Sequence, residues 1–216
     1  MYDMEMVEKD LKNFYKENHN IDKYEWLNQV PHFDAFIEDT SRYVWFMSGI
    51  PGSGKSTLAN FIAHELDNIV VLSRDKFRAY LREIYQSTDY FPTDARTELR
   101  LWTEFISSFI AANPNLDVII DQTTLNVNTL DRMKNSIIAY LSDSQKANTN
   151  FGIILKVVPL NICLERNQER CNKGFEYVPE ASIEKMYDQF LRLYYQKKSG
   201  LPSINGNYLK VLVNCE

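Results

Sequence analysis

Gly49-Ile50-Pro51-Gly52-Ser53-Gly54-Lys55-Ser56-Thr57 decides the fold of this chain, because residues 49–57 satisfy the pattern G-x-x-x-x-G-K-[ST]. Glycines at this spacing let the backbone wrap around a phosphate, so that successive amide groups point inward at it. Lys55 is placed to reach the β- and γ-phosphates, and the Ser56 hydroxyl to bind Mg²⁺. The loop predicts a nucleoside triphosphate site made by Gly49, Pro51, Gly52, Ser53, Gly54, Lys55, Ser56 and Thr57.

The segments on either side of the loop support this interpretation. Residues 43–47 form a continuous apolar run, which is typical of a buried strand. Residues 57–66 form an amphipathic helical pattern, and the dipole of a helix that begins at the loop favours bound phosphate. A glycine-rich turn without a ligand is the alternative, and the strand–loop–helix context argues against it.

Apolar runs and helical patterns alternate along the rest of the chain. We expect strands at residues 69–72, 118–120, 153–158 and 208–213, helices at 75–85, 93–112, 126–141, 160–171 and 180–197, and a loop at 142–150. This alternation predicts an α/β fold of the P-loop NTPase type, with a parallel sheet, helices on both faces and a helical lid near Gly174. Residues 1–42 are expected to form a mostly helical, acidic extension, and residues 43–216 the P-loop domain.

Composition and charge exclude several classes of protein. The 216 residues are 44% hydrophobic and 25% charged, which argues against a disordered or fibrous chain. There is no apolar stretch of about 18 residues, so no membrane partner is expected. Three separated cysteines without a C-x-x-C pair indicate a reducing compartment, so we expect a cytoplasmic protein, in the host cytoplasm if the chain is viral.

The net charge of −5 lies entirely in the N-terminal part. Residues 1–48 contain ten acidic and five basic side chains, which leaves nineteen of each in residues 49–216. This balance argues against a protein that simply coats nucleic acid, yet the neutral part can still carry a local basic groove. The apolar stripe Met4, Val7, Leu11 and Phe14 in the acidic part either packs on the domain or forms a homo-oligomer interface.

A carboxylate and an arginine follow the second expected strand. Asp75 opens toward the same crevice as the loop, because ligands gather at the carboxyl ends of parallel strands. A carboxylate there can accept the proton of an attacking hydroxyl. Arg78 lies three residues further on the same helix face and can hold an anionic part of the acceptor. The alternative is an N-cap aspartate with a solvated arginine behind it.

Two further charged features complete the predicted site. Asp121 follows an apolar strand beside the phosphate loop, where an acidic residue serves Mg²⁺ directly or through water, or else caps the next helix. Arg166 and Arg170 lie four residues apart on a helix that leads into Gly174. An arginine on such a flap can neutralise charge at the γ-phosphate, although surface ion pairs with nearby glutamates would explain the same pattern.

With these residues assembled, the chain resembles the polynucleotide 5′-kinase family from residue 43 to residue 206. The resemblance rests on the phosphate loop, on Arg-Asp-x-Phe-Arg at 74–78, on Thr123-x-Leu125-Asn126 and on the lid residues Arg166, Asn167 and Arg170. It implies that Asp75 is the general base, that Arg78 grips the phosphate beside the 5′ nucleoside and that Arg170 acts in the transition state. It also implies that Thr123, Val178 and Pro179 contact the acceptor, and that residues 200–202 and 205–206 lie near the nucleotide base.

The resemblance implies ATP-dependent transfer of a phosphoryl group, with Mg²⁺, to the 5′-hydroxyl of DNA or RNA. Two departures stand out: the family's aspartate after the third strand corresponds to Gln122 here, and no Asp-x-Asp-x-Thr phosphatase signature follows. The alternatives are a related kinase that acts on a modified DNA base, an aminoacyl-tRNA or a small molecule, and a nucleotide-binding switch or ATPase. A switch has no need of a proton-accepting carboxylate at Asp75, which favours the kinase.

Overall fold

The computed structural model of the chain describes residues 41–85, 95–125, 127–174, 177–195 and 208–215. The strands are β1 (Arg42–Ser48), β2 (Ile69–Ser73), β3 (Asp117–Asp121), β4 (Thr149–Val157) and β5 (Tyr208–Cys215). The helices are α3 (Lys55–Glu65), α4 (Arg74–Tyr85), α5 (Ala95–Ala112), α6 (Val127–Tyr140), α7 (Asp143–Ala147), α8 (Leu160–Asn172) and α9 (Glu180–Tyr195). The extension expected at residues 1–42 lies almost wholly outside the described residues.

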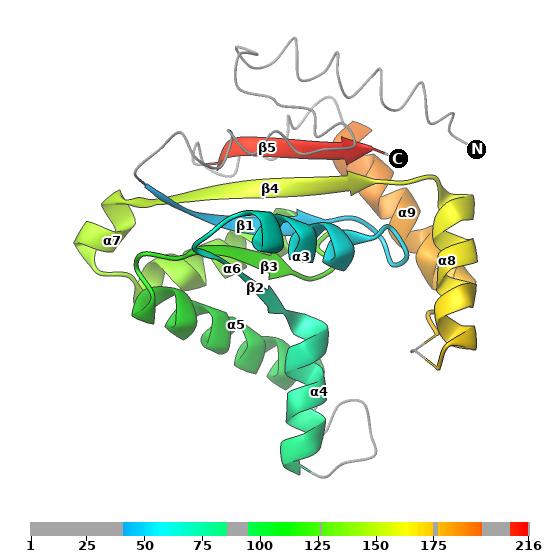
Figure 1. The fold of residues 1–216 in the computed structure, drawn as a ribbon, viewed down its shortest axis with the longest axis horizontal. Helices are drawn as coiled ribbons and strands as arrows, with labels where there is room; N and C mark the ends of the chain where they lie inside the picture. The colour runs from blue at the N-terminus through cyan, green and yellow to red at the C-terminus, as the bar shows by residue number, and fades with distance from the viewer. Residues whose placement is uncertain (1–40, 86–94, 126, 175–176, 196–207, 216) are drawn as a thin grey trace.

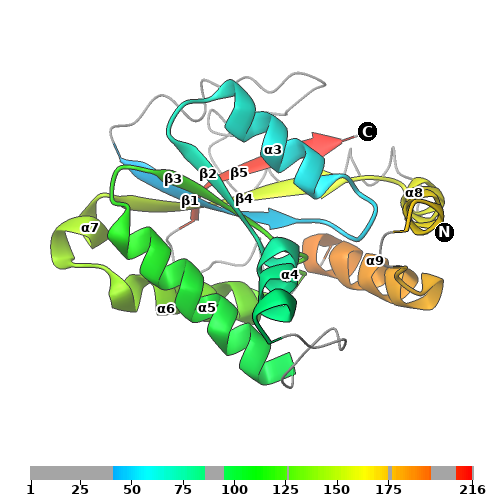
Figure 2. The ribbon, with the colours of Figure 1, turned by 60° about the horizontal axis from the view of Figure 1, so that its bottom comes forward.

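The five strands form one parallel sheet in the order β2-β3-β1-β4-β5 (Figure 1). Helix α3 covers one face, and α5, α6 and α9 lie on the other (Figure 2). The predicted α/β fold with helices on both faces is therefore confirmed. Because all strands are parallel, their carboxyl ends lie at one edge, where open α/β sheets bind their ligands. The phosphate loop follows β1 at this edge.

Two cores hold the sheet between its helix layers, because side chains of β1 alternate between the two faces. Trp45 and Met47 pack against Ala59 and Ile62 of α3. On the other face, Val44 and Phe46 join the larger core, whose members from the helices include Trp102, Ile106, Ile110, Leu130, Ile137, Ile183, Tyr187 and Phe190. This double burial explains why β1 reads as a continuous apolar run instead of an alternating one.

One sequence expectation was wrong. Residues 142–150 were expected to form a loop, but α7 occupies Asp143–Ala147 and β4 already begins at Thr149. Ser142 and Gln145 form a reciprocal capping box that stabilises this short helix. The segment is polar because α7 buries no residue, so its hydrophobic pattern gives no helical signal. None of the helices in the described ranges is long and apolar enough to cross a membrane.

Candidate active site

The phosphate loop adopts the backbone that its glycines permit. Gly52 and Gly54 have φ angles of 81° and 82°, in the left-handed region. Gly54 is the N-cap of α3, which has no side-chain cap and no acidic residue in its first turn. The Ser53 hydroxyl is fully buried and has no hydrogen-bond partner among the described residues. An uncapped helix start beside an orphaned buried hydroxyl fits a bound phosphate group.

Gly52 fixes the loop against helix α8. A Cβ atom at Gly52 would lie 2.3 Å from the carbonyl oxygen of Cys163, whereas one at Gly174, with the same φ of 81°, would meet nothing within 4 Å. We expect Gly52→Ala to lower the free energy of unfolding by about 2–4 kcal/mol, since steric overlap adds to backbone strain. Gly174→Ala should cost only about 1 kcal/mol from the strain. Urea unfolding of both variants measures the difference, and equal losses would contradict this packing.

Lys55 lies at the centre of the site. Its side chain is only 8% exposed, and Nζ donates a hydrogen bond to the carbonyl oxygen of Ile50 at 2.9 Å. Burial lowers the pKa of Lys55 to about 8, against the opposing effect of the Asp121 and Asp75 carboxylates. An ammonium group with one backbone partner retains hydrogen atoms to donate to phosphate oxygens.

Asp121 lies beside the loop at the end of β3. Its carboxylate accepts a hydrogen bond from Ser56 and is attracted by the positive charge of Lys55. Burial raises its pKa, in spite of these two contacts. A serine hydroxyl beside one carboxylate fits Mg²⁺, which is usually held by one or two carboxylates together with substrate phosphates. No cluster of three or more His, Cys, Asp or Glu side chains occurs among the described residues, so the phosphates would supply further ligands.

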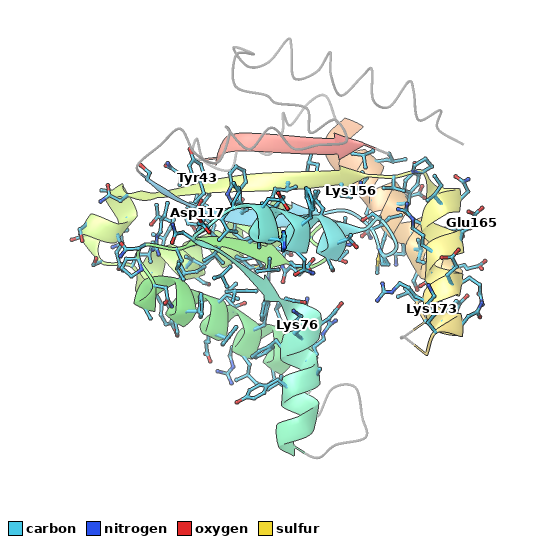
Figure 3. All side chains as sticks on the ribbon, viewed as in Figure 1. Tyr43, Lys76, Asp117, Lys156, Glu165 and Lys173 are labelled. Carbon is cyan, nitrogen blue, oxygen red and sulfur yellow. The ribbon has the colours of Figure 1, made fainter. Side chains whose placement is uncertain are left out.

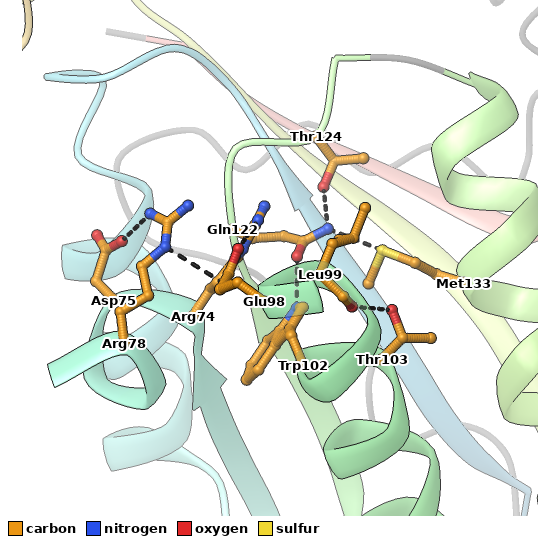
Figure 4. Close-up of polar contacts among 10 residues, drawn as sticks. All are labelled: Arg74, Asp75, Arg78, Glu98, Leu99, Trp102, Thr103, Gln122, Thr124 and Met133. Atoms are coloured by element: carbon orange, nitrogen blue, oxygen red, sulfur yellow. Dashed lines mark hydrogen bonds and ion pairs between the residues drawn. The ribbon is translucent and has the colours of Figure 1, made fainter. Parts of the chain in front are cut away.

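Asp75 and Arg78 lie at the start of α4, across from the loop. The Asp75 carboxylate is exposed, and Nη1 of Arg78 donates to its Oδ1 at 3.2 Å (Figure 4). Asp75 acts electrostatically on both Lys55 and Asp121. The main chain explains this proximity, because Ser73 pairs with Asp121 in the sheet and Asp75 follows two residues later. The structure thus places Asp75 near enough to Lys55 and Asp121 to act on their charges, and its role as proton acceptor stays a prediction.

Glu98 is a buried residue of the site region that sequence reasoning missed. This residue of α5 is 1% exposed and lies between two arginines of α4. Both Nε and Nη2 of Arg74 contact its carboxylate, and Nε of Arg78 lies 3.5 Å from its Oε1. A single glutamate inside a helical pattern gives no signal of such a role, because its partners lie 20 and 24 positions away.

Gln122 is a structural residue. Its side chain is buried, its Oε1 accepts a hydrogen bond from Nε1 of Trp102 at 2.6 Å, and its Nε2 donates to Oγ1 of Thr124 at 2.9 Å. This network joins the end of β3 to α5. Asp121, in contrast, accepts a hydrogen bond from Ser56 beside the loop. Thr123, between Gln122 and Thr124, is exposed.

Helix α8 and strand β4 bring further cations to the loop. Nη1 of Arg166 lies 4.0 Å, and Cε of Lys156 3.8 Å, from the position of a Cβ atom on Gly54. Arg170, one turn beyond Arg166, is exposed and acts electrostatically on Lys55. Lys156 was missed by sequence reasoning because it continues an otherwise apolar strand; Figure 3 shows it at the carboxyl end of β4.

Asn167 connects α8 to the predicted acceptor channel. Its Nδ2 donates to the carbonyl oxygen of Val178 at 2.8 Å, and the Val178 amide donates back to its Oδ1 at 3.2 Å. Val178 is half-buried in the core, and Pro179 beside it is exposed. Residues 200–202 and 205–206, expected near the nucleotide base, lie outside the described residues.

A hollow of about 680 Å³ lies at the opposite end of the sheet. Its lining includes Arg42 and Asp117, and Figure 3 shows Asp117 and Tyr43 far from Lys156 along the sheet. Arg42 is tied down by hydrogen bonds to Thr149 and to the carbonyl oxygen of Ile110. None of the predicted site residues lines this hollow, so we assign no role in catalysis to it.

Solved structures with the same fold come from different biological contexts. One, from an RNA repair complex named Pnkp1/Rnl/Hen1, is 23% identical with a TM-score of 0.58, over 74% of this chain and 47% of that chain. A protein from Chloroflexus aurantiacus described as a kinase is 15% identical, with a TM-score of 0.55, over 82% and 89%. A third, from the PezAT toxin–antitoxin system of Streptococcus pneumoniae, is 11% identical, with a TM-score of 0.53, over 99% and 77%.

The present chain spans about half the length of the RNA-repair chain that it matches. Among curated proteins, none matches it. The family model described as AAA domain matches residues 44–193, which run from β1 through most of α9 and contain the phosphate loop, Asp75, Asp121 and Arg170. The chain therefore belongs to this AAA domain family and has a P-loop α/β fold.

Proposed function

We propose that this protein is a kinase that transfers the γ-phosphoryl group of ATP to the 5′-hydroxyl of a polynucleotide. The observation that carries the proposal is the Asp75–Arg78 pair, whose carboxylate acts electrostatically on Lys55 and Asp121. It joins a proton acceptor to an anion-binding arginine, 3.2 Å apart, which suits a hydroxyl that lies next to a phosphodiester.

In the proposed reaction, Asp75 accepts the proton of the 5′-hydroxyl while the hydroxyl oxygen attacks the γ-phosphorus. The bond between the γ-phosphorus and the bridging oxygen breaks, and ADP leaves with the bonding electron pair. Lys55 donates hydrogen bonds to the β- and γ-phosphates, and the loop amides hold the β-phosphate. Ser56 and Asp121 would hold Mg²⁺, which neutralises charge on the phosphates.

Arg170 has a separate role in this proposal, the neutralisation of charge in the transition state. We expect Arg170→Ala to lower kcat on the order of 10³-fold while the dissociation constant of ATP changes little, because a transition-state contact contributes little to ground-state binding. Arg132→Ala, which removes an exposed arginine from α6, is the control and should change neither quantity. Weaker ATP binding with an unchanged kcat would show that Arg170 is a ground-state ligand.

The acceptor is tested with labelled ATP and four reaction mixtures, separated by thin-layer chromatography. They contain a 5′-hydroxyl DNA oligonucleotide, a 5′-hydroxyl RNA oligonucleotide, a neutral sugar or no acceptor. We expect label to enter at least one oligonucleotide, and neither the sugar nor inorganic phosphate to gain it at a comparable rate. If labelled inorganic phosphate is released at the same rate in all four mixtures, an ATPase is favoured. Label in the sugar would favour a small-molecule kinase.

A further inference from the structure

Glu98 is a buried charge that links Arg74 and Arg78 of α4 to helix α5. It lies in the first turn of α5 and is almost fully buried. Its Oε1 accepts from Nε of Arg74 at 2.9 Å, its Oε2 meets Nη2 of the same guanidinium, and Nε of Arg78 lies 3.5 Å from Oε1 (Figure 4). One carboxylate thus contacts two guanidinium groups.

The helix that carries Glu98 is itself fixed to the sheet. Trp102 follows Glu98 by one turn, and its Nε1 donates to Oε1 of Gln122 at the end of β3. Asp121, the carboxylate beside Ser56, immediately precedes Gln122. One hydrogen bond, one turn of α5 and one ion pair therefore link Gln122 at the end of β3 to Arg78. Buried hydrogen-bonded groups hold such geometry more rigidly than exposed ones.

The Arg78 guanidinium contacts one buried and one exposed carboxylate. Its Nε side faces the buried Glu98, and its Nη1 reaches the exposed Asp75 at 3.2 Å. The Arg78 side chain is 19% exposed. The buried contact sets the plane of the guanidinium, and its outer edge is then presented beside the proton acceptor. Without Glu98 the long arginine side chain would regain its rotamer freedom.

We propose that Glu98 is a positioning residue that orients Arg78 toward a phosphate next to the acceptor hydroxyl. This inference rests on the proposed function and deepens it, because it requires an acceptor with an anionic group beside the reacting oxygen. The Michaelis constant of a phosphorylated acceptor then depends on Glu98, whereas the affinity for ADP does not.

Positioning and charge balance predict opposite effects for Glu98→Gln. This substitution removes a negative charge beside Arg74 and Arg78, so charge balance alone would strengthen the binding of an anionic acceptor. Positioning predicts weaker binding, because the NH2 group that replaces one carboxylate oxygen cannot accept a hydrogen bond and leaves a single uncharged acceptor for the two guanidinium groups. We expect the KM for a nucleoside 3′-monophosphate to rise about tenfold or more, as for a lost charge-assisted contact.

Glu98→Asp provides a second variant with the original net charge. Its side chain is one methylene shorter, so positioning predicts a higher KM here too. Charge balance predicts no change in KM, because the net charge is the same. The matched control is Glu104→Gln, since Glu104 also lies on α5 and pairs with an arginine, Arg100, at 2.7 Å on the exposed surface. That control should leave every kinetic constant unchanged.

The measurement compares a nucleoside 3′-monophosphate with the nucleoside that lacks the phosphate, as acceptors for wild type and the three variants. ADP affinity by isothermal titration calorimetry and the unfolding midpoint are recorded for each protein. We expect both Glu98 variants to lose preference for the phosphorylated acceptor while ADP affinity stays within about twofold. An unchanged or lower KM for both Glu98 variants, or equal losses with the two acceptors, would overturn the inference. If wild type phosphorylates neither these acceptors nor a 5′-hydroxyl oligonucleotide, the proposed function itself fails.

Discussion

Lys55→Met is expected to abolish phosphoryl transfer, with a loss of at least about 10²-fold in kcat, because preorganised charge stabilises the transferring phosphoryl group. The methionine keeps the aliphatic stem in its buried position, so the fold should survive. The same variant should bind ATP more weakly, since the ammonium group faces the β- and γ-phosphates in the bound state. Steady-state kinetics and calorimetric titration with ATP measure the two effects.

Lys134→Met is the matched control for this experiment. Lys134 of α6 is also a buried lysine, with burial lowering its pKa, but it packs over the ring of Phe151, in the larger core. Its replacement should leave kcat and ATP affinity close to those of wild type. A Lys55→Met protein with activity within a few-fold of wild type would contradict the assignment of the nucleotide site.

Asp75→Asn is expected to remove transfer to the acceptor and to leave ATP binding largely intact. The asparagine keeps the size of the side chain and an oxygen that can accept from Arg78, but it cannot take up a proton. Loss of a general base costs about 10²–10⁴-fold in rate. The rate of oligonucleotide phosphorylation and the dissociation constant of ATP are measured for both proteins.

The control for Asp75→Asn is Asp143→Asn. Asp143 also begins a helix and pairs with a basic residue three positions later, Lys146, at 3.0 Å, but it lies on α7. Its replacement should have no effect on the rate. If Asp75→Asn phosphorylates the oligonucleotide as fast as wild type, the basis for the acceptor site is removed. If neither wild type nor Asp75→Asn transfers the group and both hydrolyse ATP equally fast, an ATPase is favoured.

The sequence predicts most of the fold because a strand buried on both faces leaves a continuous apolar run. The runs at β1, β2 and β3 and the helices between them appear within a few residues of where they were expected. The short helix α7 was missed because it buries no residue, and its capping box is the one local signal that marks it. Hydrophobic periodicity therefore finds the elements that form the core.

The candidate site likewise contains residues that the sequence predicts and residues that it does not. Lys55 and Ser56 are predictable because nine consecutive residues encode the loop, and Asp75 and Asp121 because strand ends converge at one edge of a parallel sheet. Glu98 and Lys156 are not, since their positions near the site depend on how α5 and β4 pack. Gln122 shows the limit of a resemblance: it corresponds to a family aspartate, but it serves to join β3 to α5.

The central claim is that the phosphoryl group ends on the 5′-oxygen of a polynucleotide. The most direct measurement incubates the protein with labelled ATP and Mg²⁺ and an oligonucleotide whose 3′ end is blocked, then digests the product to single nucleotides. The account predicts label in the 5′-terminal nucleotide alone, and none when the oligonucleotide already carries a 5′-phosphate. Label on a base, on an internal position or only in inorganic phosphate would contradict it.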